Sequence, residues 1–262
     1  MVNRIDKKLA SLKSDGKPAL VPYLTVGYPT VSSSYEIAQA LLNSGADMLE
    51  LGIPFSDPLA DGPIIQMTSF KALENGVNIE VAFEVARKLR IKNHESPLIF
   101  MGYFNPFLSY GIPEFMIKAS SVGIDGIIIP DLPSEESKGL AKECEKHGIH
   151  LIPLLAPTST EDRIASACAT AGGFIYCVSL TGVTGAKNKM SQNVVSLVDD
   201  IRKHTELPVL VGFGISSKVD IQQIADFADG AIVGSALLDV ITNADDNTEV
   251  AEASKFIKGL VL

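Results

Sequence analysis

The chain has 262 residues, of which 46% are hydrophobic, and its formal net charge is −9. This hydrophobic content is sufficient for one large core, whereas the net negative charge provides no basic surface for nucleic acid. No apolar run approaches the roughly 20 residues of a membrane span, and the charged N-terminal segment lacks the apolar core of a signal peptide, so we expect a cytoplasmic protein that binds neither nucleic acid nor a membrane.

The first predicted element is an amphipathic helix over residues 3–15, which carries Ile5, Leu9 and Leu12 on one face and precedes a strand over residues 19–26. A serine cluster at 32–34 is expected to cap the next helix, which runs to about residue 43. Short apolar strands then alternate with helical segments. Strands are predicted over residues 48–52, 98–101, 126–129, 150–155, 174–178, 209–212 and 231–233. Helices are predicted over residues 80–92, 113–121, 135–147, 161–170, 194–204, 218–227 and 248–258.

This alternation of about eight strands and helices predicts a closed (β/α)₈ TIM barrel with an extra N-terminal helix. The main competing fold is an open Rossmann-type sheet, which carries a GxGxxG phosphate fingerprint after its first strand. Gly27, Tyr28 and Pro29 occupy that place and provide no such fingerprint. Because no linker or change of composition divides the chain, we expect residues 1–262 to form a single domain.

The second predicted strand carries an acid. With the period of two that a strand imposes, Met48, Glu50 and Gly52 share one face, so a carboxylate stands where a strand normally has an apolar side chain. A buried acid paired with an arginine or with backbone donors is the alternative explanation. The loop that follows is rich in Pro, Asp and Gly and supplies Asp57 and Asp61, so two acids can converge on one cavity.

Glycine turns follow the seventh and eighth predicted strands, where TIM barrels commonly bind phosphate. These turns contain Gly212, Gly214, Gly234 and Ser235. Glycines allow backbone N–H groups to approach an anion, and the start of a following helix favours negative charge. The pattern predicts a phosphate site, and glycines that only form turns are the alternative.

Several chemistries are excluded by residue type. A Schiff-base aldolase requires a lysine on a barrel strand, and none of the predicted strands contains one. The four histidines are not clustered with carboxylates, and the three cysteines have no CxxC spacing, so no metal site is expected. Acid–base chemistry by carboxylates on a phosphorylated ligand remains. Tyr176 faces the same interior and is either core filling or part of the site.

The motifs LELGIPFSDPLADGPIIQ, YFNPFLSYG, IIIPDLPSEES, LIPLLAPTST, YCVSLTGVTG, VGFGIS and VGSA occur in this order over nearly the whole chain. Together they resemble the tryptophan synthase α-subunit family. The resemblance implies a TIM-barrel lyase that cleaves indole-3-glycerol phosphate to indole and glyceraldehyde 3-phosphate in tryptophan biosynthesis. It also implies a β subunit as partner in an α2β2 heterotetramer, with no cofactor in this chain and pyridoxal phosphate only in the β subunit.

The resemblance also assigns roles to single residues. It implies that Glu50 is the proton-transferring acid and base, and that Asp61 accepts the indole N–H. Other residues match family positions that line the indole pocket, close the site or hold the phosphate. They are Tyr23, Met101, Ile128 and Tyr176 for the pocket, Thr184 for the lid, and Gly185, Phe213, Gly214, Gly234 and Ser235 for the phosphate.

Two departures from the family pattern bear on how the site closes. Leu180 stands where some members have Arg, and Tyr28 stands where many have Asp. Neither position coincides with the two acids. Both leave open how this chain holds its lid and the turn after its first strand.

Two apolar, proline-containing loops, around residues 55–57 and 105–107, are expected to be exposed at the open end of the barrel. They are either lids that fold back or, as the resemblance implies, the interface with the β subunit. Two other functions remain as alternatives. One is a phosphosugar isomerase or flavin-dependent barrel that shares the phosphate loops, and the other is a non-catalytic barrel that regulates a partner.

Overall fold

The strands are short, apolar and parallel in the computed structural model, which describes residues 2–178, 192–212 and 214–262. They form one sheet in the order β5-β4-β3-β2-β1-β9-β8-β7-β6. In chain order the strands are β1 (Ala19–Thr25), β2 (Leu49–Gly52), β3 (Leu98–Met101), β4 (Gly126–Ile128), β5 (His150–Ile152), β6 (Leu154–Leu155), β7 (Ile175–Val178), β8 (Val209–Gly212) and β9 (Gly230–Val233).

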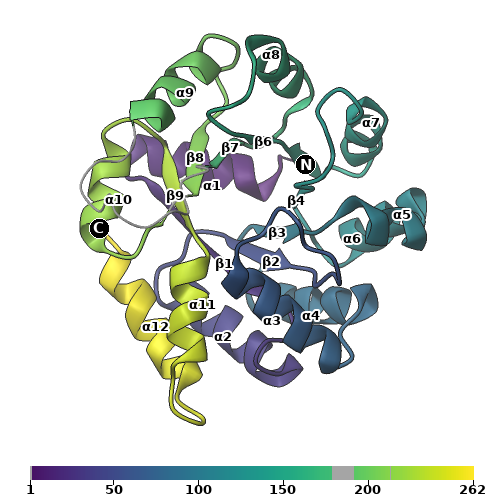
Figure 1. The fold of residues 1–262 in the computed structure, drawn as a ribbon, viewed down its shortest axis with the longest axis vertical. Helices are drawn as coiled ribbons and strands as arrows, with labels where there is room; N and C mark the ends of the chain where they lie inside the picture. The colour runs from purple at the N-terminus through teal and green to yellow at the C-terminus, as the bar shows by residue number, and fades with distance from the viewer. Residues whose placement is uncertain (1, 179–191, 213) are drawn as a thin grey trace.

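A single proline explains why nine strands are described where about eight were predicted. β5 and β6 are separated only by Pro153, and both fall in the predicted strand over residues 150–155. β5 pairs with β4, whereas β6 pairs with β7. Proline has no N–H for a sheet ladder, so it divides this strand into two parts that bond to different neighbours. The divided strand closes the sheet into a barrel (Figure 1).

The helices surround this barrel (Figure 1). They are α1 (Arg4–Ser14), α2 (Val31–Asn43), α3 (Pro63–Glu74), α4 (Ile79–Lys92), α5 (Phe104–Tyr110), α6 (Ile112–Ser121), α7 (Lys138–Lys146), α8 (Glu161–Thr170), α9 (Gln192–Arg202), α10 (Lys218–Ala225), α11 (Ser235–Thr242) and α12 (Glu249–Leu260). The predicted TIM barrel with an additional N-terminal helix is therefore confirmed. Every helix in the described part of the chain falls short of the length and apolarity that crossing a membrane requires.

Alternate residues of each strand face two separate cores. Met48 packs in a cluster inside the barrel, whereas Leu49 and Leu51 belong to the larger cluster between the strands and the helices. This follows the strand period of two. The inner cluster, called the lumen cluster below, consists of Ile5, Leu9, Ala19, Val21, Met48, Ile99, Ile128, Ile152, Phe174, Leu210 and Ile232.

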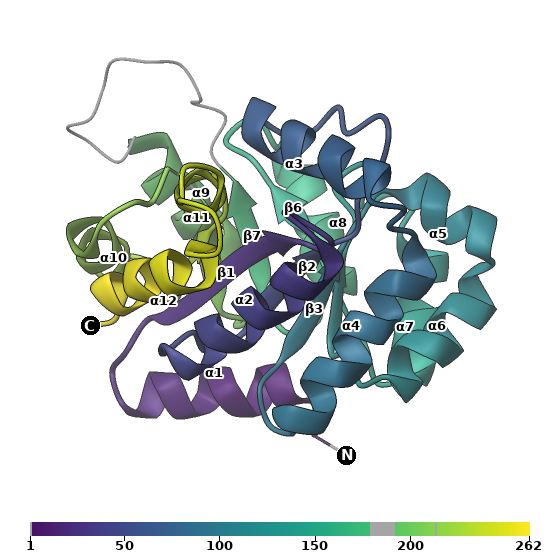
Figure 2. The ribbon, with the colours of Figure 1, turned by 90° about the horizontal axis from the view of Figure 1, so that it is seen from below.

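Helix α1 closes the amino-terminal end of the barrel. Its Ile5 and Leu9 belong to the lumen cluster. Its Asp6 lies 2.9 Å from Nε2 of His150, the first residue of β5. Figure 2 shows α1 and α3 at opposite ends of the barrel, so the end covered by α3 is the one where the strands finish.

A buried acid ties this closed end together. Asp125, which precedes β4 and is 3% exposed, accepts a hydrogen bond from Arg4 through Oδ1 at 2.8 Å. Its Oδ2 accepts from Arg90 at 2.8 Å and from the Leu98 N–H at 2.9 Å. One carboxylate thus links α1, α4, β3 and β4.

Helix α2 begins slightly earlier than predicted. Its N-cap is Thr30, whose side chain accepts a hydrogen bond from the Ser33 N–H. The serine cluster at 32–34 therefore lies inside the first turn rather than capping it. Ser34 instead uses its hydroxyl to accept the Gly27 N–H, which fixes the turn after β1.

We expect Asp125→Ala to lower the free energy of unfolding by about 3–5 kcal/mol, because it leaves a buried arginine without its partner. Glu84→Ala is the matched control, since it removes a surface carboxylate that pairs with Arg87 on the same helix. Urea unfolding of both variants checks the prediction. Similar losses for the two variants would show that the Asp125 network does not stabilise the closed end.

Candidate active site

Glu50 lies inside the barrel near the carboxyl end of β2. It follows Met48 of the lumen cluster by two residues and is 1% exposed. Neither of its carboxylate oxygens has a hydrogen-bond partner within the described residues. Burial, with a smaller contribution from the nearby charge of Asp61, raises the pKa of Glu50 to about 8. The alternative of a structurally paired acid therefore has no support among these residues.

Asp61 lies in the loop between β2 and α3 and is held by a tyrosine. The Tyr103 hydroxyl donates to Asp61 Oδ2 at 3.0 Å and accepts the Ala60 N–H at 2.9 Å. Burial raises the pKa of Asp61 to about 6, while the hydrogen bond from Tyr103 opposes the rise. At neutral pH these pKa values leave Glu50 mostly protonated and Asp61 mostly ionised. The site therefore contains an acid that holds a proton beside a fixed negative charge.

Tyr23 and Tyr176 approach the two acids from β1 and β7. Burial is the main cause that raises the pKa of each hydroxyl, and the charges of Glu50 and Asp61 contribute. Each ring lies across a glycine of a neighbouring strand: a Cβ at Gly52 would overlap Tyr23, and a Cβ at Gly212 would overlap Tyr176. The absent side chains give the two tyrosines their space inside the barrel.

The other predicted pocket residues, Met101 and Ile128, are apolar and lie at the ends of β3 and β4. Ile128 is fully buried in the lumen cluster, and Met101 packs against it from the end of β3. Met101 pairs in register with Gly52 on one side and with Ile128 on the other. Both side chains therefore belong to the same end of the barrel as Glu50.

The predicted glycine turns also follow the carboxyl ends of their strands. Gly214 has a φ of 44°, in the left-handed region that favours glycine, and a Cβ there would meet nothing within 4 Å. Gly234 lies beside Tyr23, because a Cβ at Gly234 would be 3.5 Å from the Cβ of Tyr23. The turn after β9 is thus adjacent to Tyr23, whose strand pairs in register with the strand of Glu50.

The two helices that follow these turns differ at their N-termini. The start of α10 is closed by a capping box in which Ser217 and Asp220 bond each other's backbone N–H groups. The start of α11 is capped by Gly234 without any side-chain hydrogen bond, so the N–H groups around Ser235 are not occupied by a capping side chain. An uncapped helix start of this kind favours an anion.

Three predicted site residues lie outside the described residues. They are Thr184, Gly185 and Phe213, and Leu180 lies outside them as well. Tyr28, the other departure from the family pattern, is buried and its hydroxyl lies 2.9 Å from Thr242 Oγ1 of α11. That contact ties the turn after β1 to the helix that begins at Ser235.

One prediction about the open end is wrong. The segment around residues 105–107, predicted as an exposed loop, is part of helix α5, and Phe107 is buried against Phe115 with ring centroids 4.5 Å apart. Phe55 is half-buried and packs on Tyr103. Leu59, at 91% exposure, and Leu108, at 56%, are the strongly exposed apolar side chains on these two segments.

Tyr103 is the site residue that sequence reasoning missed. It lies in the quoted YFNPFLSYG motif, two residues after β3, which is a position where barrel enzymes place functional side chains. Its contact with Asp61 spans 42 positions of the chain, and no local pattern predicts such a contact.

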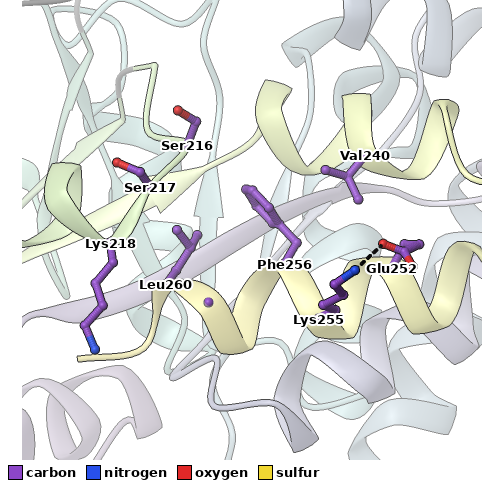
Figure 3. Close-up of a pocket in the computed structure, with 9 residues that line it drawn as sticks. Ser216, Ser217, Lys218, Val240, Glu252, Lys255, Phe256 and Leu260 are labelled. Carbon is purple, nitrogen blue, oxygen red and sulfur yellow. Dashed lines mark ion pairs between the residues drawn. The ribbon is translucent and has the colours of Figure 1, made fainter.

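One surface cavity lies away from this group. It has a volume of about 420 Å³ and is formed between the start of α10 and helices α11 and α12, with Phe256 and Leu260 in its wall (Figure 3). None of the predicted site residues that the structure describes lines it. Within residues 2–178, 192–212 and 214–262, no group of three or more His, Cys, Asp or Glu side chains is arranged to hold a metal ion.

Comparison with known proteins gives consistent matches. A family model described as tryptophan synthase alpha chain matches residues 9–259. The tryptophan synthase alpha chain of Thermoanaerobacter sp. (strain X514) is 44% identical over 260 residues, which cover 99% of this chain and 98% of the relative. That of Roseiflexus sp. (strain RS-1) is 45% identical over 259 residues and covers 99% of both chains.

A solved structure agrees. The crystal structure of the tryptophan synthase alpha chain from Legionella pneumophila subsp. pneumophila has a TM-score of 0.90 and 35% sequence identity to this chain. The match covers 99% of this chain and 96% of that one. The similarity in sequence and in fold therefore extends over nearly the whole length.

Proposed function

Since the chain belongs to the tryptophan synthase alpha chain family, we propose that it is a lyase that cleaves indole-3-glycerol phosphate to indole and glyceraldehyde 3-phosphate in tryptophan biosynthesis. The observation that carries this function is the buried carboxyl group of Glu50, for which the described part of the chain supplies no hydrogen-bond partner. The comparisons support this activity rather than an isomerase, a flavin-dependent barrel or a non-catalytic regulator.

Glu50 provides the proton transfers of this reaction. Cleavage of the bond between indole C3 and the glycerol chain needs a proton at C3 and the removal of a proton from the adjacent hydroxyl. With a pKa of about 8, Glu50 keeps its proton at neutral pH and delivers it to C3. The resulting carboxylate then removes the hydroxyl proton as the C–C bond breaks, and the aldehyde forms.

Asp61 stabilises the charge that this step creates. Protonation at C3 leaves positive charge on the ring nitrogen, and a carboxylate that is ionised before the reaction stabilises it without further reorganisation. Asp61 also accepts the indole N–H in the bound substrate. Tyr103, whose hydroxyl bonds Oδ2, holds the Asp61 carboxylate in place and reduces the rise of its pKa.

The remaining residues position the substrate. Tyr23, Met101, Ile128 and Tyr176 form the pocket for the indole ring, and their burial supports this role. Gly214, Gly234 and Ser235 bind the phosphate through backbone N–H groups, with the uncapped start of α11 as the main anion site. From the sequence we add Gly185 and Phe213 to the phosphate site and Thr184 to the lid. Binding energy from the phosphate orients the bond that breaks.

We also propose that the chain forms a single domain and works in the cytoplasm with a β subunit in an α2β2 heterotetramer. The partner surface comprises the segments around residues 55–57 and 105–107, and it includes the exposed Leu59 and Leu108. Tyr103 connects the two segments, because its hydroxyl accepts the Ala60 N–H and the residue directly precedes α5. Pyridoxal phosphate is expected only in the β subunit.

We expect Glu50→Gln to lower the turnover of indole-3-glycerol phosphate by roughly 10²–10⁴-fold, because glutamine transfers no proton. Asp61→Asn should cause a similar loss because it removes the fixed negative charge. An assay of indole release by the isolated chain measures both effects. Glu74→Gln, at the exposed end of α3, is the control. Near-normal turnover in either site variant would remove that residue from its role.

We expect a bell-shaped dependence of kcat/KM on pH. The pKa of Asp61 is raised to about 6, so activity should rise as pH increases through that value and the carboxylate ionises. The pKa of Glu50 is raised to about 8, so activity should fall as pH increases further and its proton is lost. Because the two carboxyl groups interact, the two apparent pKa values of this profile describe the pair and not either residue alone. A profile without change from pH 5 to 9 would contradict this assignment.

We expect Leu59→Asp and Leu108→Asp each to weaken binding of a family β subunit by about 1–2 kcal/mol, or roughly 5–30-fold in Kd. Ile91→Asp is the control, because Ile91 is as exposed as Leu108 but lies at the end of α4, near the opposite end of the barrel. Titration calorimetry measures the affinities. Equal affinity for all variants would place the interface elsewhere.

A further inference from the structure

A line of buried hydroxyl groups connects the site to helix α3. Thr25 Oγ1, at the end of β1, lies 2.8 Å from Thr68 Oγ1 in the middle of α3. The same Thr25 oxygen lies 3.5 Å from the hydroxyl of Tyr23, and Thr68 bonds the carbonyl of Ile65 at 3.0 Å. Both threonines are 0% exposed. The line therefore runs from the lumen, beside Glu50, to the helix that covers the barrel mouth.

Packing alone does not require hydroxyl groups at these two positions. Valine has nearly the same shape as threonine, so filling the space at either position does not require a hydroxyl. A buried hydroxyl without a partner costs stability, whereas two that bond each other are satisfied together. The Thr25–Thr68 contact therefore fixes one specific placement of α3 against β1, because any slide of the helix would separate the two oxygens.

The placement of α3 controls the placement of Asp61. The helix begins at Pro63, two residues after this acid. The side chain of Gln66, in the first turns of α3, donates to the carbonyl of Asp61 at 2.9 Å and reaches the Pro58 carbonyl at 3.4 Å. The loop that carries Asp61 is thus bonded to α3 and moves with it.

The other end of the line is bonded to the strand beside Glu50. Thr25 belongs to β1, in which Tyr23 pairs in register with Glu50 of β2. The bonded hydroxyls of the two threonines thus connect α3, with the loop that carries Asp61, to β1, which pairs with the strand that carries Glu50. We propose that Thr68, acting through Thr25, is a positioning residue that sets the distance between the Asp61 and Glu50 carboxyl groups.

This inference rests on the proposed lyase function only for its kinetic consequence. If the distance between the acids increases, the charge of Asp61 contributes less to the environment of Glu50, and the substrate no longer meets both groups at once. Among the described residues, the titratable groups that interact with Glu50 are Asp61, Tyr23 and Tyr176, and of these only Asp61 is ionised at neutral pH. A change in the titration of Glu50 therefore reports a displacement of Asp61.

The experiment compares Thr25→Val, Thr68→Val and the double variant. Each single variant removes the bond between the two hydroxyls and leaves the remaining one with a single contact, to the Ile65 carbonyl or to the Tyr23 hydroxyl, so it should lose stability. The double variant removes both groups, so its free energy of unfolding should be close to that of wild type. We nevertheless expect kcat of the double variant to be lower by roughly tenfold or more, since small displacements of catalytic groups are costly. Its KM should change less than its kcat.

Two controls separate positioning from general damage. Thr68→Ser keeps the hydroxyl and should retain most of the turnover. Thr170→Val removes a half-buried threonine hydroxyl at the end of α8, away from the acids, and should leave the kinetics unchanged. A stable double variant with wild-type kcat and an unchanged pH profile would overturn the inference, as would an equal loss in Thr68→Ser.

A second readout is independent of turnover. Infrared difference spectroscopy follows the protonated carboxyl band of Glu50, assigned by its absence in Glu50→Gln. The band should disappear at lower pH in the double variant than in wild type, because the charge of Asp61 is farther away. A chain that titrates in this way without releasing indole would disprove the lyase function and support the positioning role. Identical titrations in the two proteins would disprove the positioning role.

Discussion

A carboxyl group that is buried without a partner is the constraint on which the rest of the structure depends. Glu50 is 1% exposed, and neither oxygen is bonded within the described residues. Leaving a buried polar group unbonded costs about 1–3 kcal/mol, which the two apolar cores of the barrel must offset. The same environment makes the group useful, because water and fixed donors would return its pKa to the ordinary range. The stability of the barrel and the reactivity of the site are therefore opposed at this residue.

The acids at the two ends of the barrel differ in how many hydrogen bonds they accept. At the amino-terminal end, both oxygens of Asp125 are occupied, by Arg4 on one side and by Arg90 and the Leu98 N–H on the other. At the carboxyl end, Asp61 is bonded by the Tyr103 hydroxyl, and Glu50 has no hydrogen-bond partner among the residues that the structure describes. Helix α1 seals the first end, whereas glycine turns and an uncapped helix start surround the second. This division is typical of TIM barrels, in which one end stabilises and the other carries chemistry.

The sequence was sufficient to predict features that depend on local period. The period of two placed Glu50 on the same face as Met48, and the strand and helix alternation predicted the barrel. It was not sufficient to predict features that depend on contacts between residues far apart in the chain. Helix α5 has only seven residues and contains a proline, so its segment around residues 105–107 was interpreted as an exposed loop. The contact between Tyr103 and Asp61, and that between Thr25 and Thr68, join residues more than 40 positions apart. No pattern within one segment predicts such pairs.

The pairing of β1 with β9 has a consequence for how the protein is made. The first and the last strand of the barrel lie side by side, with Ala19 opposite Gly230. A ribosome delivers the N-terminal part first, so β1 has an open edge until the final strand emerges. During that interval water reaches the interior, and Glu50 is an ordinary hydrated glutamate. The pKa of Glu50 therefore rises only when β9 pairs with β1 and the barrel closes. Until then the unfinished chain does not bear the cost of a buried carboxyl group without water.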